Sequence, residues 1–130
     1  MKDPHFGHLR DLGLTVRPAT LMDVPAAVPM FNAAEAELFG APAYTIERYQ
    51  QEWLAPGFDL PRDTRLVLSP DGAIVGCAEV WTLSDPPVNP WIWARVDPAW
   101  ENRGIGTALL AWSLTRSLQE LRRVPAEARV

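Results

Sequence analysis

The sequence has little of three things, namely cysteine, net positive charge and long apolar runs. Its single cysteine, Cys77, cannot form an intramolecular disulfide, which excludes a small secreted domain held together by disulfides. A formal net charge of -4 gives no broad positive field that would attract nucleic acid or an anionic membrane. The N-terminal residues lack the apolar middle of a signal peptide. We therefore expect a cytoplasmic protein without a nucleic-acid or membrane partner.

The composition is that of a folded protein. Of the 130 residues, 48% are hydrophobic and six are tryptophan, which is too apolar for a disordered chain. This length favours a single domain with one substantial core. Residues 1–13 are polar and are predicted to form an N-terminal arm, with the domain proper spanning residues 14–130.

The first half of the chain predicts one short strand and two helices. Residues 14–18 form an apolar run closed by proline. Thr20 and Asp23 then have the spacing of a capping box, and apolar residues repeat at helical intervals up to Gly40. Pro29 lies inside this repeat, which predicts a kink or a late helix start. Residues 45–54 predict a second helix that is capped by Thr45.

The second half predicts a meander followed by a long helix. Two extended runs, residues 64–69 and 73–83, flank the turn sequence Pro-Asp-Gly and should pair as an antiparallel hairpin. Residues 91–96 alternate so that Trp91, Trp93 and Arg95 share one face. A helix runs from Gly104 to Pro125, and a strand starts after it. The predicted fold is α/β, with a sheet that is antiparallel through four strands and joined by a helical crossover to a parallel fifth.

The stretch "VDPAWENRGIGTALL" places two glycines just before this helix. Unpaired N–H groups at a helix N-terminus can hold a phosphate without a lysine. Gly104 and Gly106 leave the backbone uncovered, Asn102 tolerates a left-handed conformation, and Arg103 adds a positive charge. A simple tight turn is the alternative interpretation. A dinucleotide-binding fold is excluded, because Leu109 stands at its third glycine position and a meander precedes the loop.

These residues and the order of elements resemble the GCN5-related N-acetyltransferases. Members commonly open with a strand ending in Arg-Pro, as "TVRPAT" does, and carry a valine-x-proline step before the acetyl-CoA loop, as Val96-Asp97-Pro98 does. The resemblance implies acetyl-CoA as acetyl donor. The main chain of six residues would hold its pyrophosphate, and the backbone near Val96 would pair with its pantetheine arm. The six are Asn102, Arg103, Gly104, Ile105, Gly106 and Thr107.

The sequence departs from the family pattern in two respects. The first loop position is Glu101 instead of glutamine or arginine, and this carboxylate should weaken pyrophosphate binding unless it faces solvent or pairs with Arg103. Family domains also continue with a further strand, helix and hairpin. The chain is then a fragment, is completed by another chain, or is the opening part of a tandem acetyltransferase. An open strand edge predicts a self-associating or only marginally stable species. The sheet would be completed in a homodimer or by a second domain.

Acetyl transfer to an amine needs a proton acceptor, and Glu79 is the candidate within the predicted hairpin. An exposed sheet carboxylate is the competing interpretation. Trp91 and Trp93 could bind the acceptor or pack against a helix. We interpret Cys77 as a small buried hydrophobe. His5 and His8 are interpreted as part of a solvated tail, so no metal site is assigned.

The resemblance thus implies an N-acetyltransferase, an acyltransferase that moves an acetyl group from acetyl-CoA directly to a primary amine of a small molecule or peptide. The alternative is a non-catalytic acetyl-CoA-binding or structural domain of a longer, tandem acetyltransferase.

Overall fold

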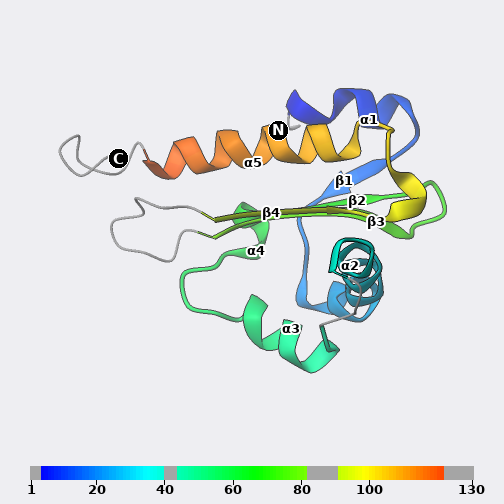
Figure 1. The fold of residues 1–130 in the computed structure, drawn as a ribbon. Helices are drawn as coiled ribbons and strands as arrows, with labels where there is room; N and C mark the ends of the chain where they lie inside the picture. The colour runs from blue at the N-terminus through cyan, green and yellow to red at the C-terminus, as the bar shows by residue number, and fades with distance from the viewer. Residues whose placement is uncertain (1–3, 40–43, 82–90, 122–130) are drawn as a thin grey trace.

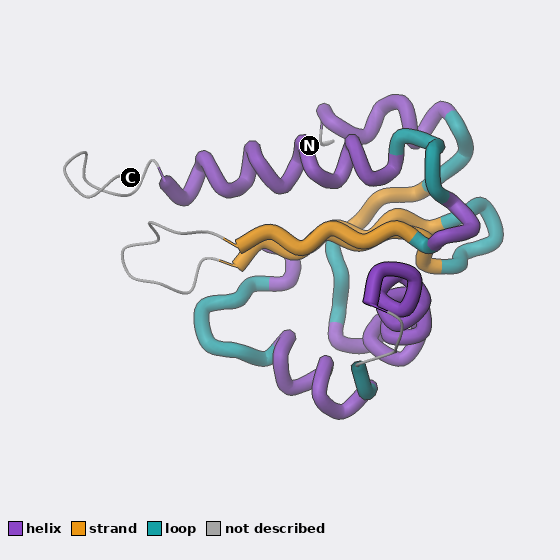
Figure 2. Tube along the Cα trace, viewed as in Figure 1, coloured by secondary structure: helices purple, strands orange, loops and turns teal. Residues whose placement is uncertain are grey.

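A four-stranded sheet lies between two layers of helices in the computed structural model, which describes residues 4–39, 44–81 and 91–121 (Figure 1). Helices α2 and α3 cover one face of the sheet, and α5 with the N-terminal helices covers the other (Figure 2). The helical elements are η1 (Pro4–Phe6), α1 (Gly7–Asp11), η2 (Leu21–Asp23), α2 (Val24–Phe39), α3 (Ile46–Trp53), α4 (Leu60–Asp63), η3 (Pro98–Trp100) and α5 (Ile105–Leu121).

The described strands form an antiparallel sheet in the order β1-β2-β3-β4. Their bounds are β1 (Thr15–Arg17), β2 (Thr64–Leu68), β3 (Ile74–Trp81) and β4 (Trp91–Val96). The β2–β3 turn contains Gly72 at φ 90°, a left-handed conformation that favours glycine. The predicted hairpin and meander are confirmed. The predicted parallel fifth strand lies outside the described residues.

Local capping explains where the helices on the α2 face begin. The Asp23 carboxylate accepts a hydrogen bond from the Thr20 N–H at 2.8 Å, as the capping box predicts. The helix then continues through Pro29 from Val24, so a late start is wrong. Thr45 caps α3 by accepting from the Arg48 N–H at 3.2 Å.

Each face of the sheet carries its own hydrophobic core. The core under α2 and α3 includes Phe31, Tyr49 and Trp53, whereas the core under α5 includes Ile105 and Leu109. Helix α5 approaches β3 very closely at Gly76, where a Cβ atom would lie 2.8 Å from Cγ2 of Ile105. A glycine is needed at this position because any side chain would push the helix away.

The N-terminal segment differs from the predicted solvated arm. Residues 4–11 are helical, and the side chains of Phe6 and Leu9 are fully buried in the core under α5. Nε2 of His5 lies 3.0 Å from Oγ1 of Thr115 on α5, so His5 is not part of a free tail. The prediction was wrong because two apolar residues at helical spacing are enough to dock a short helix, although the segment is polar on average.

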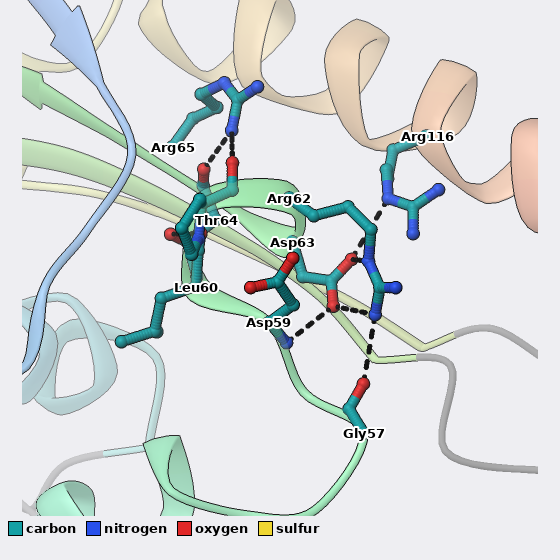
Figure 3. Close-up of polar contacts among 9 residues, drawn as sticks. Gly57, Asp59, Leu60, Arg62, Asp63, Thr64, Arg65 and Arg116 are labelled. Carbon is teal, nitrogen blue, oxygen red and sulfur yellow. Dashed lines mark hydrogen bonds and ion pairs between the residues drawn. The ribbon is translucent and has the colours of Figure 1, made fainter.

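An ionic cluster fixes α4 beside α5 (Figure 3). Asp63 is fully buried, and its carboxylate accepts hydrogen bonds from Nε of Arg62 at 2.9 Å and from Nε of Arg116 at 3.0 Å. The N–H of Asp59 donates to the same carboxylate at 3.0 Å. We call Asp63, Arg62 and Arg116 the Asp63 cluster. It joins residues that are 53 positions apart in the sequence.

Candidate active site

The loop between β4 and α5 has the left-handed turns that its sequence predicts. After Val96, the Asp97 side chain caps η3 by accepting from the Ala99 N–H at 2.9 Å. Asn102 then has φ 63° and Gly104 has φ 84°, both in the left-handed region. Two left-handed residues turn the chain sharply into α5, whose first N–H groups have no partner within the helix.

This loop borders a groove of about 510 Å³, here called the loop groove. Six predicted binding residues line it together, namely Val96, Asn102, Gly104, Ile105, Gly106 and Thr107. At Gly106 a Cβ would lie 3.5 Å from Cγ2 of Val96, so the missing side chain leaves open the space between α5 and β4.

Two residues of the predicted loop behave differently. The guanidinium of Arg103 lies over the Trp100 ring, with its Cζ 4.7 Å from the ring centroid, and Arg103 lines a separate cavity together with His8. Glu101 is exposed to solvent and is one of the residues that line the loop groove. A carboxylate that faces solvent is screened, which reduces its repulsion of a bound phosphate.

A second cavity of about 710 Å³ adjoins the loop groove. It brings together all three residues predicted for acceptor binding and catalysis, Glu79, Trp91 and Trp93. We call it the aromatic cavity because its lining also includes Tyr44, Tyr49 and Trp81, alongside Arg48, Glu52, Ala55 and Arg95. Trp93 and Arg95 line both hollows, so the two share a wall on β4.

Strand pairing explains why these side chains meet. In the β3–β4 register, Trp81 is opposite Trp91, Glu79 opposite Trp93, and Cys77 opposite Arg95. Cross-strand partners on one face lie within contact distance, so alternation along two strands builds one continuous surface. This confirms the predicted shared face of Trp91, Trp93 and Arg95.

Glu79 is 2% exposed, so the alternative of an exposed carboxylate is wrong. Its Oε2 accepts from Oη of Tyr49 at 2.8 Å and from Arg95 at 3.2 Å, while Oε1 accepts from Nε1 of Trp81 at 2.9 Å. Burial of a carboxylate is favourable only when its oxygens are paired, and here both are.

Arg95 is one of the residues that sequence reasoning did not assign to the site, together with Tyr49 and Glu35. It is 7% exposed and donates to Glu35 at 3.2 Å, to Glu79 at 3.2 Å and to the Tyr44 hydroxyl at 3.0 Å. Burial disfavours its charge, but nearby Tyr49 and Glu79 outweigh that effect and raise the Arg95 pKa. We call Arg95, Glu35 and Glu79 the Arg95 network.

The structure gives no support for a cysteine nucleophile or a metal site among the described residues. Cys77 is fully buried, which raises the pKa of its thiol, and the nearby Glu79 charge acts in the same direction. This agrees with a small buried hydrophobe. Within the described ranges, no group of three or more His, Cys, Asp or Glu side chains could hold a metal ion. No helix in the same ranges is both long and apolar enough to cross a membrane.

The fold and the site define an α/β protein in which a loop groove and a second cavity share a wall on the last described strand of an antiparallel meander. A family model, described as acetyltransferase (GNAT) family, matches residues 28–128. The chain therefore belongs to the acetyltransferase (GNAT) family.

Solved structures of this family are similar to the chain. A GCN5-related N-acetyltransferase from Sphaerobacter thermophilus is 28% identical with a TM-score of 0.76, over 88% of this chain and 35% of that one. A GCN5-related N-acetyltransferase from Kribbella flavida is 26% identical with a TM-score of 0.63, and the match covers 85% of this chain and 68% of that one. A putative acetyltransferase from Salmonella typhimurium, solved with its cofactor acetyl-CoA, is 18% identical with a TM-score of 0.64, over 83% and 65%. No curated protein matches the chain. The chain thus spans about a third of the Sphaerobacter protein.

Proposed function

We propose that the chain transfers an acetyl group from acetyl-CoA to a primary amine by direct attack. The observation that carries this proposal is the wall shared by the loop groove and the aromatic cavity, formed by Trp93 and Arg95. Two substrates that react directly must lie in contact, and adjoining hollows allow that. Membership of the acetyltransferase family supports this function.

The loop groove fits the diphosphate of acetyl-CoA. Phosphate oxygens need backbone donors and room for close approach, and the start of α5 offers both at Gly104 and Gly106. Asn102, Ile105 and Thr107 complete this part of the groove, with Val96 and Arg103 beside it. The Salmonella structure with acetyl-CoA supports the choice of this donor. When bound, acetyl-CoA supplies a thioester whose carbonyl carbon an amine can attack.

The amine must lose a proton before it attacks, and we propose that Glu79 receives this proton through Tyr49. Tyr49 is one of the residues that line the aromatic cavity, and its hydroxyl donates to Glu79. Burial, together with the Glu79 charge, raises the Tyr49 pKa, so the hydroxyl stays protonated. Because this protonated hydroxyl already donates to Glu79, it can relay a proton. Its oxygen accepts the ammonium proton while its own proton passes to Glu79. The attacking nitrogen then forms the C–N bond, the C–S bond breaks, and a second nitrogen proton ends on the CoA thiolate.

Calorimetric titration with acetyl-CoA tests the donor half of this proposal. Gly106→Asp places a carboxylate in the loop groove and should weaken binding more than about tenfold, because like charges brought together cost several kcal/mol. Gly7→Asp is the matched control, since Gly7 also lies in the first turn of a helix, and a Cβ there would have nothing within 4 Å. Equal binding by both variants would contradict a phosphate site at the loop.

A second function is favoured by the relative lengths of the proteins. Because the chain matches 35% of the Sphaerobacter protein, it could serve as an acetyl-CoA-binding or structural domain of a longer acetyltransferase. Acetyl-CoA binding without turnover of any amine by the chain, together with turnover by the full gene product, would favour this second function. A homodimer and a cytoplasmic location are further proposals, to be tested by gel filtration and by cell fractionation.

A further inference from the structure

We infer that the acceptor is a primary amine carried on a flat aromatic body and without an acidic group. This inference rests on the proposed acetyl transfer and names the substrate class of the same site. It comes from the walls of the aromatic cavity and from the way its charged residues are paired.

The walls present aromatic rings that are held in place. Trp81 is stacked on Phe58, with ring centroids 3.8 Å apart and an interplanar angle of 8°, and its Nε1 is bonded to Glu79. Because Phe58 covers one face of Trp81, a ligand can stack only on the opposite face. Tyr49 is held by its own bond to Glu79, and 5.0 Å separates the Cζ of Arg95 from the Trp93 ring centroid. Walls fixed before binding lose little entropy when a flat ligand enters.

Trp91 leaves a further ring open to a ligand. It is 63% exposed although it lies opposite Trp81 in the strand register. Trp91 is also part of the cavity lining, and a large exposed aromatic surface is costly in water and is relieved by a stacking partner. An aromatic ring gains from such stacking, whereas a saturated ring of equal size does not present the flat face that it needs.

The charges of the cavity favour a cation over an anion. Arg48 pairs with Glu52 at 3.6 Å, and Arg95 pairs with both Glu79 and Glu35. Both arginines that line the cavity are thus paired with carboxylates. The four charged residues of the lining, Arg48, Arg95, Glu52 and Glu79, sum to zero, and Glu35, which pairs with Arg95 from the loop groove, brings the total to -1. An ammonium group is attracted to the carboxylates of this set, and the faces of the aromatic rings add cation–π attraction. A carboxylate or phosphate on the acceptor would be repelled.

Four probes of similar size test the inference. 2-Phenylethylamine is compared with 2-cyclohexylethylamine, which lacks the flat ring, with 2-phenylethanol, which lacks the amine, and with phenylalanine, which adds a carboxylate. Each is titrated by calorimetry with and without saturating CoA, which has no acetyl group to transfer. We expect 2-phenylethylamine to bind at least about threefold more tightly than each of the others. Against 2-cyclohexylethylamine this ratio corresponds to the weaker end of aromatic pair energies. Against 2-phenylethanol it corresponds to the weaker end of cation–π energies, and against phenylalanine to repulsion of the added carboxylate.

A matched pair of variants locates the effect. Trp91→Leu removes an exposed ring and should reduce the preference for 2-phenylethylamine over 2-cyclohexylethylamine to below twofold, whereas Leu114→Ala, on the exposed face of α5, should leave it unchanged. If acetyl-CoA binds but 2-phenylethylamine shows no preference over 2-cyclohexylethylamine or phenylalanine, the substrate class is overturned and the proposed function stands. If acetyl-CoA itself does not bind, the proposed function fails separately.

Discussion

The Arg95 network and the Asp63 cluster are built from the same chemistry but have different surroundings. Each pairs buried carboxylate with buried arginine, and each joins distant parts of the chain. The Arg95 network lines the loop groove and the aromatic cavity, whereas the residues of the Asp63 cluster, drawn in Figure 3, are in the lining of neither. Burial and ion pairing are therefore shared by scaffold and site, and the adjoining hollows distinguish the two.

The largest expected effect is on stability, in the Asp63 cluster. Asp63→Ala leaves Arg116 buried without its carboxylate and should lower the free energy of unfolding by about 3–5 kcal/mol, as measured by urea denaturation. Calorimetry on the folded variant should give an unchanged acetyl-CoA Kd, because the cluster lies outside both hollows. The double variant Asp63→Leu with Arg116→Met, which removes both charges, should recover most of the lost stability. If it is no more stable than Asp63→Ala, loss of the Asp63–Arg116 ion pair is not the cause.

The next effect is on activity, in the Arg95 network. Glu79→Gln keeps the shape of the side chain but cannot accept a proton, so kcat should fall at least about 100-fold while acetyl-CoA binding persists. Tyr49→Phe should lower kcat by a similar factor if the proton passes through its hydroxyl. Asp63→Asn is the matched amide substitution in the other cluster, and it should alter stability without lowering kcat of the folded protein. An unchanged kcat in Glu79→Gln would remove Glu79 from the proposed proton path.

The cap of α3 is a neutral hydrogen bond, in contrast to these charged groups. Thr45→Ala removes the cap of α3, which carries Tyr49, and should lower the free energy of unfolding by about 1 kcal/mol. Arg48→Ala retains the backbone N–H that Thr45 accepts from, and it should cost less in the same urea titration. A loss as large as that of Asp63→Ala would show that α3 depends on its cap more than on burial of its apolar face.

The smallest effect concerns a partly exposed pair. Arg17 donates to Asp23 at 2.8 Å, and mainly this bond holds the pKa of the Asp23 carboxyl below its ordinary value of 3.8. The pair stabilises the fold fully above that value, by less than about 1 kcal/mol, and the contribution is lost as the pH falls below it. Asp23→Asn should therefore be less stable than the native chain at pH 7, with a smaller difference at pH 3. A difference of equal size at both values would exclude the ionised pair as its source.

Local signals in the sequence predicted much of this structure. The Pro-Asp-Gly turn, the alternation from Trp91 to Val96 and the left-handed Asn102 depend on near neighbours, and all three are confirmed. The docked N-terminal helix and α4 were missed because each is only one or two turns long and is held by distant residues. The Arg95 network was missed for the same reason, since Glu35 and Arg95 are 60 positions apart. Pairings of this kind follow from packing, which no local pattern encodes.

The close approach of α5 at Gly76 has a mechanical consequence for the loop. Ile105, which a Cβ at Gly76 would strike, is also the first residue of α5 and part of the loop groove. Packed interiors transmit displacement because they compress little. The position of the backbone at the start of α5 is thus fixed by the absence of one methyl group on β3. Substitutions at Gly76 would change the width of the loop groove although Gly76 is not part of the loop.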